Sequence, residues 1–319
     1  MLHLRVISPV ERTDDVLGLL ETAVGVTNLV VLHGVARSPK GDLVQFDVAR
    51  EAANEVIERL RHLGLCADGS IAVERVDLSL SDVADRAEEE APGEGDDAVV
   101  WAELAQRVSD DTRITWAFLA FLTIATQLAA VGVIVNSPIL IVGAMVLGPE
   151  FGAIVAVCFG LLRRDGPLIG HALRTLAVGF AAAIAVTTVC VVATRLSGWI
   201  GPATLFDHEE IEFIVKPDRW SFVVALLAGA AGVLSVTAGK SSALVGVFIS
   251  VTTVPAAGYF AVAAALARWD DMTASVTQLA VNIAGMIISG TVTLLLQRAY
   301  WSRFGLRLPI RPPRNSGRA

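Results

Sequence analysis

Long runs of apolar residues dominate the last two thirds of the chain. The first run, residues 114–162, contains a single ionisable residue, Glu150. Further charge-free runs follow over residues 175–194, 220–239, 241–267 and 272–297. A helix needs about 20 apolar residues to cross a bilayer, and the first run is long enough for two such helices. The pattern predicts a polytopic α-helical membrane domain with six spans within residues 114–300.

The first 80 residues follow other periods. Strands are predicted over residues 2–7, 27–35, 43–48 and 71–76, and helices over residues 10–23 and 49–63. The turn Ser38-Pro39-Lys40-Gly41-Asp42 separates the second and third strands, and Gly64 ends the second helix. This βαββαβ order predicts a ferredoxin-like α+β domain over residues 1–80.

Residues 81–113 connect the two parts. The stretch 81–97 (SDVADRAEEEAPGEGDD) is acidic, contains Pro and Gly and lacks large apolar groups, so it is predicted to be a solvated linker. Helical spacing resumes over residues 99–108, which predicts an amphipathic helix.

Composition and charge agree with this division. The chain is 54% hydrophobic and 18% charged, with a mean hydropathy of +0.62, which is too apolar for an ordinary soluble protein. Residues 1–113 hold 23 Asp and Glu against 11 Lys and Arg, whereas residues 114–319 hold 9 against 14. An acidic head on an apolar body excludes a nucleic-acid binder, and three cysteines exclude a disulfide-stapled secreted domain. Cys66, Cys158 and Cys190 are expected to be reduced packing residues.

The loop charges predict the orientation in the membrane. Residues 1–15 have no long apolar core, so no signal peptide is expected and the head should stay in the cytoplasm. Arg163, Arg164, Lys240 and the basic tail 301–319 then face the cytoplasm, and the acidic loop 207–218 faces outward. Both termini are therefore predicted to be cytoplasmic. Interfacial tryptophans are expected close to span ends: Trp116, Trp199, Trp220, Trp269 and Trp301.

The six spans divide into two sets of three, and a duplicated unit of three spans would be inverted relative to its copy. The middle span of each set contains Gly and an interior Pro: Asn136-Ser137-Pro138 leads to Gly148-Pro149, and Ser241-Ser242 leads to Pro255. Proline inside a span breaks or kinks it, and paired interruptions indicate a mid-membrane binding site. The alternative is that these Gly and Pro residues only allow close helix packing.

Glu150 is the main candidate for chemistry, because an acid inside a span is expensive unless it faces the bundle interior. A structural hydrogen bond to a neighbouring helix is the alternative role. Polar residues elsewhere in the apolar runs are Gln127, Gln278 and a set of pathway candidates. The predicted substrate or ion pathway comprises Glu150, Pro149, Gly148, Asn136, Ser137, Thr252, Thr253, Pro255 and Asn282.

Catalysis is not expected. His3, His33 and His62 are scattered, no Cys or His pair has metal-ligand spacing, and no nucleophile is spaced with a base. No cofactor is indicated, and the identity of any bound metal is left open.

The motifs Asn136-Ser137-Pro138, Gly143-Ala144-Met145 and Gly148-Pro149, with the stretch 246–255 and Asn282, resemble a prokaryotic family of hydrophobic proteins called domain of unknown function 389. This chain departs from the family in having Ala256 after Pro255 where many members have a second proline, and Glu150 where they have an apolar residue. The resemblance implies a prokaryotic inner-membrane protein with a small cytosolic domain, and it implies no activity.

Two functions follow as hypotheses. The leading one is a transport or channel-like protein, whose site lies at broken helices two and five and whose head regulates or assembles it. The alternative is a membrane-anchored sensor that binds a small cytosolic ligand through its head. The expected partners are the lipid bilayer, an unidentified small molecule or ion, and further copies of the chain, because runs such as Ala181-Ala182-Ala183 allow close helix contact.

Overall fold

The computed structural model describes residues 1–76, 78–91, 98–200, 219–238 and 253–302. It separates into two compact units, residues 1–104 with 297–319 and residues 105–296. Each unit is described by itself below. The predicted acidic loop 207–218, Lys240, Thr252 and nearly all of the basic tail lie outside the described residues, as does the first half of the predicted fifth span.

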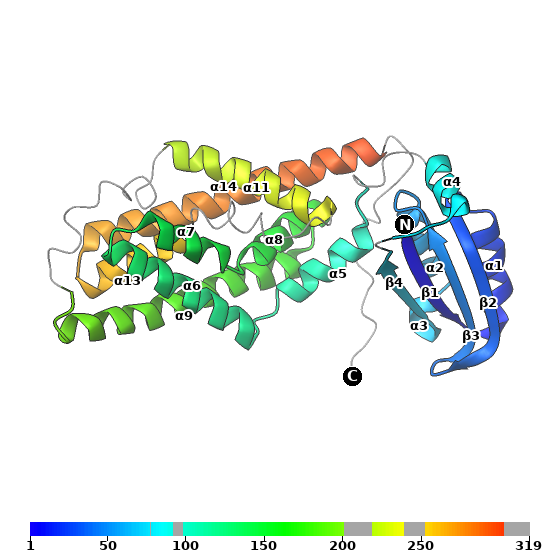
Figure 1. The fold of residues 1–319 in the computed structure, drawn as a ribbon, viewed down its shortest axis with the longest axis horizontal. Helices are drawn as coiled ribbons and strands as arrows, with labels where there is room; N and C mark the ends of the chain where they lie inside the picture. Colours follow the sequence, from blue (N-terminus) through cyan, green and yellow to red (C-terminus); the bar gives the residue numbers. More distant parts are fainter. Residues whose placement is uncertain (77, 92–97, 201–218, 239–252, 303–319) are drawn as a thin grey trace. The chain divides into compact units, whose positions relative to one another are not determined.

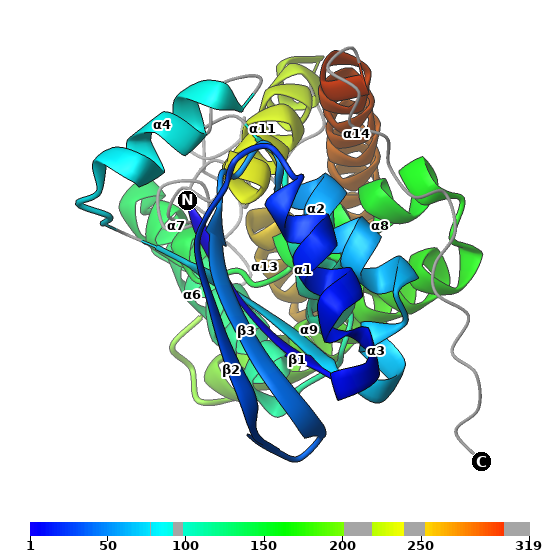
Figure 2. The same ribbon diagram turned by 90° about the vertical axis from the view of Figure 1, so that its right-hand side faces the viewer.

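The N-terminal unit is built on a four-stranded antiparallel sheet, and all four predicted strands are present. The sheet has the order β2-β3-β1-β4, and Figure 2 shows the helices α1, α2 and α3 on one side of it. Its elements are β1 (Leu2–Ser8), the short 3-10 helix Val10–Arg12, α1 (Thr13–Glu21), β2 (Val26–Arg37), β3 (Lys40–Val48), α2 (Ala53–His62), α3 (Leu65–Asp68) and β4 (Ser70–Arg75).

The core of this unit lies between the sheet and its helices. Alternate residues of β1 and β3 are buried, as the period of two requires. Leu4 and Phe46 from these strands are completely buried together with Val16 of α1 and Leu60 of α2. The apolar face of the sheet therefore packs against the apolar faces of the helices.

The predicted linker is wrong over part of its length. Residues 82–90 form the helix α4 (Asp82–Glu90), which Ser81 caps by accepting a hydrogen bond from the backbone N–H of Ala84. Ala84 and Ala87 are buried, and α4 packs against β2. The apolar face of α4 is small, and acidic residues make up most of the segment. Its composition is therefore like that of a linker.

The predicted helix after the linker is present as α5 (Trp101–Asp111). The side-chain amide of Asn54 in α2 fixes its start. Asn54 Oδ1 accepts a hydrogen bond from the backbone N–H of Trp101 at 2.9 Å, and Nδ2 donates to the carbonyl of Val99 at 2.7 Å. One partly buried amide thus satisfies a helix N–H group that has no partner within the helix.

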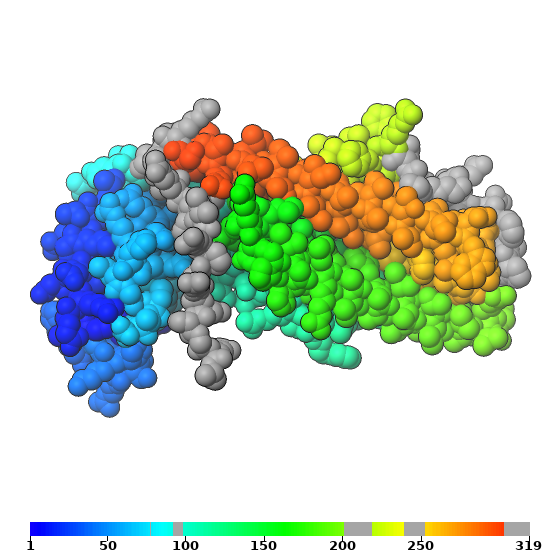
Figure 3. Space-filling model, turned by 180° about the vertical axis from the view of Figure 1, so that it is seen from behind, coloured from blue at the N-terminus to red at the C-terminus, as the bar shows by residue number. Residues whose placement is uncertain are grey.

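The second unit is an all-helical bundle, drawn from green to orange in Figure 1. Its helices are α6 (Trp116–Ile134), α7 (Pro138–Val146), α8 (Phe151–Arg163), α9 (Gly166–Leu196), α11 (Arg219–Ala238), α13 (Val254–Ala265) and α14 (Trp269–Ser302), whose last residues group with the first unit. Figure 3 shows α14 running beside the green segment of α8 and α9.

Within the described residues, four helices are long and apolar enough to cross a bilayer: α6, α9, α11 and α14. The bent pair α7 and α8 raises the number to five. The remaining predicted span, the fifth, is represented by α13, which has 12 residues and follows a segment outside the described residues. These apolar helices indicate a membrane protein.

The tryptophans near the span ends are mostly exposed, as expected of interfacial residues. Trp116, Trp199, Trp220 and Trp269 each expose more than two thirds of their surface. Trp301 is the exception, because it is buried at the end of α14.

Candidate functional site

A break in the second predicted span creates the candidate site. Helices α7 and α8 meet at an angle of 56° across a four-residue gap that contains Gly148, Pro149 and Glu150. Proline has no N–H to donate and its ring clashes with the preceding turn, so the helix bends here. The carbonyl of Glu150 accepts a hydrogen bond from the N–H of Ile154 at 3.3 Å, and Glu150 is therefore the N-cap residue of α8.

Thr253 occupies the equivalent place on α13. Its carbonyl accepts a hydrogen bond from the N–H of Ala257 at 3.1 Å, which makes it the N-cap residue of that helix. Pro255 lies in the first turn of α13, where its missing N–H has no intrahelical partner to lose. Pro255 thus begins a helix, and the residues before Thr253 lie outside the described part of the chain.

The two cap residues bind each other. Neither side chain caps its own helix, and instead the Thr253 hydroxyl donates a hydrogen bond of 2.6 Å to Glu150 Oε1. Both residues are completely buried. The N-termini of α8 and α13 therefore meet at one carboxyl group. Each helix end carries a partial positive charge, and both reduce the cost of a negative charge at Glu150.

Helix α13 is enclosed by other helices. Ten of its twelve residues are buried, and it packs against α6, α7 and α9. Gly258 allows this contact, since an added Cβ would lie 2.7 Å from the Cβ of Ala129 and 2.9 Å from the backbone nitrogen of Ala130. At the other end, Arg195 Nη1 donates to the carbonyl of Ala265 at 2.6 Å. Protein groups thus surround a helix too short to cross the bilayer.

Two further amides are buried on α14. Gln278 and Asn282 are four residues apart, so they share one face of the helix, and both are completely inaccessible to solvent. Neither side-chain polar atom of Gln278 has a hydrogen-bond partner in the part of the chain that the structure describes. A buried amide with unused hydrogen-bonding capacity is costly for folding alone and favours a polar guest or water.

Asn136 and Ser137 are not placed beside Glu150. They form the turn between α6 and α7, at the end of α7 opposite to Glu150. Asn136 adopts a left-handed φ of 51°, and the Ser137 hydroxyl accepts a hydrogen bond from the N–H of Leu140 at 3.5 Å. Their visible role is to turn the chain and cap a helix, which their sequence Asn-Ser-Pro also suits.

Sequence reasoning missed a second acid near the site. Asp111, at the end of α5, lies against the first turn of α8, because an added Cβ on Gly152 would be 2.5 Å from its Oδ2. Asp111 is exposed, yet partial burial of its carboxyl raises its pKa, opposed by the nearby Arg107. Its position as the last acid before the first apolar run was the signal available in the sequence.

The described residues show no cluster of three or more His, Cys, Asp or Glu side chains that would suit a metal ion. Glu150 and Thr253 contribute one carboxyl and one hydroxyl, a smaller set than the six to eight oxygens of a calcium site. The arrangement is better suited to exchanging a proton or holding a weakly bound monovalent ion.

Comparison with known proteins finds one family model and a distant relative. Residues 145–288 match the model of a domain of unknown function, DUF389. These residues, less than half of the chain, are therefore similar to that domain family. An uncharacterized protein of Methanocaldococcus jannaschii is 23% identical over 217 residues, which cover 68% of this chain and 64% of the relative. The match thus spans less than two thirds of that relative's length. No solved structure matches the chain.

The match confirms the resemblance predicted from the sequence motifs. The DUF389 region begins at Met145 and ends at Ile288, so it contains Glu150, Thr253 and Asn282. Asn136, Ser137 and the N-terminal sheet lie outside it. The match therefore contains both members of the Glu150–Thr253 hydrogen bond.

Proposed function

We propose that this protein is a transport or channel-like membrane protein in which Glu150 carries a proton or a monovalent cation. The observation that carries the proposal is the buried hydrogen bond between Thr253 and Glu150, which joins the starts of two interrupted helices inside the bundle. Ends of discontinuous helices near the bilayer midplane form the substrate sites of many transporters. Acids buried within spans also mark proton relays.

The local chemistry favours a proton over a cation. A proton needs only one carboxylate oxygen, whereas a bound cation needs several oxygen ligands, and the described residues bring together one carboxyl group and one hydroxyl group here. Asp111 of α5 provides an exposed acid beside Gly152, which lies in the first turn of α8 two residues after Glu150. A proton would enter at Asp111 and pass to Glu150 through water, and the Thr253 hydroxyl would hold the receiving carboxyl group in place.

The surrounding architecture follows from the same proposal. We infer six spans in two inverted sets of three, with α7–α8 and the segment ending in α13 as the two discontinuous middle spans. The inner membrane of a prokaryote is the inferred location, with both termini in the cytoplasm. The head is inferred to be ferredoxin-like, supported by its strand order, and to regulate or assemble copies of the chain.

Proton flux into liposomes tests the proposal. The full-length chain is reconstituted with the pH dye pyranine inside, and a potassium gradient with valinomycin makes the lumen negative. We expect faster acidification than in empty liposomes and loss of this difference for Glu150→Gln. Thr253→Ser should retain it, and Asp270→Asn, an exposed acid at the start of α14, is the matched control. Wild-type flux by a folded Glu150→Gln variant overturns the role of Glu150.

Parallel uptake measurements with radioactive sodium, and with rubidium as a potassium analogue, distinguish transport of a cation from transport of a proton. Uptake of either ion that depends on Glu150, without proton flux, would replace the proton by a cation. Absence of proton and ion flux in liposomes that contain folded protein would contradict transport of these cargoes.

The sensor hypothesis is supported by the open side of the head sheet. Its residues point away from α1 and α2 and include His3, whose Nδ1 lies 2.7 Å from Asp47 Oδ1, and the exposed Arg5. We propose this polar face as the ligand surface of the alternative function. Thermal unfolding of the full-length protein with a panel of nucleotides and metabolites tests it: stabilisation that Arg5→Gln abolishes supports sensing, and no stabilisation contradicts it for that panel.

A further inference from the structure

A basic pocket lies within the helical unit and shares no lining residue with the Glu150–Thr253 pair. It has a volume of about 490 Å³, within the range of typical ligand pockets. The end of α5 and the segment before α6 form one wall, and the first turns of α9 form the other. The lining residues are Ser109, Thr112, Arg113, Ile114, Leu168, His171, Arg174 and Thr175.

Helical periodicity aligns the α9 wall. Leu168, His171 and Arg174 are spaced by three residues, so they lie on one face of the helix. A hydrogen bond joins the two walls, because the Thr175 hydroxyl donates to the carbonyl of Thr112 at 2.6 Å. The two elements that carry the arginines are thus joined by a hydrogen bond.

The charge of the pocket is positive. Arg113 and Arg174 line it, and no carboxylate does. Arg113 makes a loose ion pair with Asp110 at 3.8 Å, with both side chains mostly exposed, and Arg174 has no ion pair among the residues that the structure describes. His171 Nδ1 lies 2.7 Å from the carbonyl of Pro167, so that carbonyl occupies one ring nitrogen and Nε2 is left for a ligand.

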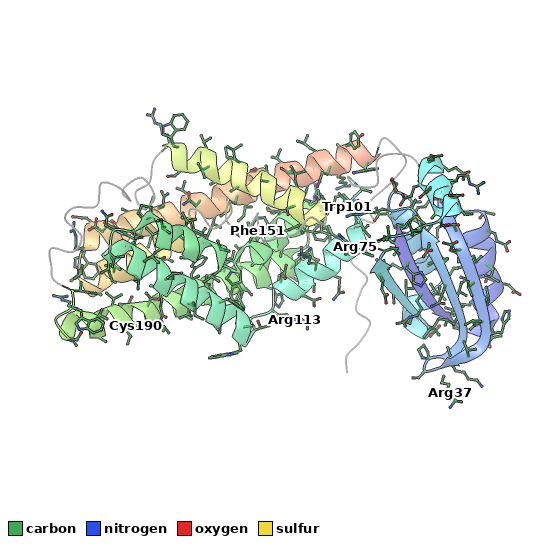
Figure 4. The ribbon with its side chains drawn as sticks, in the orientation of Figure 1. Arg37, Arg75, Trp101, Arg113, Phe151 and Cys190 are labelled. Atoms are coloured by element: carbon green, nitrogen blue, oxygen red, sulfur yellow. The ribbon has the colours of Figure 1, made fainter. Side chains whose placement is uncertain are left out.

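The sequence indicates where the pocket lies relative to the membrane. Arg113 is the last charged residue before the apolar helix α6, and Arg174 is the last before the charge-free run 175–194 of α9. Trp116 begins α6 and is 84% exposed, as an interfacial tryptophan would be. Figure 4 shows Arg113 where α5 gives way to α6. The pocket therefore lies where the apolar spans meet the aqueous boundary.

We propose that this pocket binds the phosphate of an anionic phospholipid headgroup. Two arginines supply the charge and paired N–H donors that suit phosphate oxygens. Ile114 and Leu168 provide an apolar side for the first carbons of the lipid. Basic pockets between helices at the membrane boundary are recognised sites for such headgroups. The inference is independent of what Glu150 does.

Native mass spectrometry of the delipidated full-length protein tests this site. Phosphatidylglycerol is titrated into the wild type and into Arg113→Gln/Arg174→Gln. Each boundary arginine contributes roughly fivefold to binding of an anionic lipid, so we expect the double variant to bind roughly 25-fold more weakly. Arg298→Gln is the matched control, since Arg298 also borders an apolar run at a span end but does not line the pocket.

Further measurements distinguish specific binding of the headgroup in the pocket from a general effect of charge. Leu168→Trp fills the pocket with both arginines intact and should weaken binding of phosphatidylglycerol, which a diffuse charge effect would not. Phosphatidylcholine should bind more weakly than phosphatidylglycerol, and inorganic phosphate at equal concentration should not displace the lipid. Equal lipid binding by the wild type and a folded double variant overturns the proposal, as does displacement by inorganic phosphate.

Discussion

Thr253 donates a 2.6 Å hydrogen bond to Glu150 across a sequence separation of 103 residues. Each residue is the N-cap of a helix and leaves its own helix uncapped by its side chain. The bond therefore replaces two local caps by one long-range contact between α8 and α13. Such an exchange stabilises a particular packing of the bundle, and it holds the carboxyl group where both helix ends act on it.

Removing the hydroxyl should separate these roles. Thr253→Val keeps the shape of the side chain but deprives Glu150 of a donor in a buried place. We expect a loss of about 1–3 kcal/mol in stability, because a buried polar group loses its partner. Thr253→Ser should remain close to the wild type. Thermal unfolding in one detergent measures both variants, and an unchanged midpoint for Thr253→Val would show that the bond contributes little.

The strands and apolar runs were predictable because their signals are local. Alternation in β1 and β3 and the absence of charge over residues 175–194 depend only on neighbouring positions. The break at Pro149 was also predictable, since proline excludes a continuous helix. The pairing of Glu150 with Thr253 was not, because it depends on how two helices distant in sequence pack.

Other differences have similar causes. Asn136 and Ser137 have polar side chains in an apolar region, and the same residue types serve turns and binding sites equally well. Helix α4 was hidden because its buried face consists of Ala84 and Ala87, which add little hydrophobicity to an acidic segment. Asp111 gave only a positional signal, as its approach to Gly152 is a tertiary contact.

Asp42 should make the head sensitive to acid. It is buried, and it accepts hydrogen bonds from the backbone N–H of Gly34 at 2.7 Å and the hydroxyl of Thr13 at 2.8 Å. These two bonds, with nearby His33, lower the pKa of Asp42. Because the folded pKa lies below the unfolded one, its contribution to stability is present above about pH 4 and is lost as the pH falls through the folded value.

Asp42→Asn is therefore expected to destabilise the head at pH 7 by about 1–3 kcal/mol and to cost progressively less at pH values below 4. Hydrogen exchange of peptides from β2 and β3 in the full-length protein measures the effect at pH 7, and thermal unfolding follows the acid limb. Asp14→Asn, at an exposed position in α1, is the control. If the loss of stability caused by Asp42→Asn did not change with pH, the effect would come from packing and not from the charge of Asp42.

Glu51 should behave in the opposite way. It is 2% exposed, and burial raises its pKa, with a further contribution from the carboxylate of Glu88. A raised folded pKa favours the neutral acid, so the stability from Glu51 is full below its unfolded value and is lost as the pH rises through the folded value. At pH 7 the buried carboxylate therefore destabilises the head.

Glu51→Gln removes that charge while keeping the shape. We expect a higher unfolding temperature than the wild type at pH 7 and little difference near pH 4, because the wild-type acid is then largely neutral. Differential scanning fluorimetry of the full-length protein at both pH values checks this, with the exposed Glu21→Gln as the control. A destabilised variant at pH 7 would mean that the carboxylate has a stabilising contact.

Gly258 should be intolerant of a methyl group. The Cβ of Gly258→Ala would lie 2.7 Å from the Cβ of Ala129 and 2.9 Å from a backbone nitrogen of α6, so helix α13 must move away. We expect a cost of about 1–3 kcal/mol from overpacking.

Gly170 in α9 has no atom within 4 Å of an added Cβ, and Gly170→Ala should be neutral or stabilising by up to about 1 kcal/mol. The thermal midpoints of the two variants measure the difference, and proton flux of Gly258→Ala shows whether the displaced helix disturbs Glu150. Equal midpoints would mean that α6 and α13 separate at little cost, and the close contact would then not be what fixes the position of Thr253.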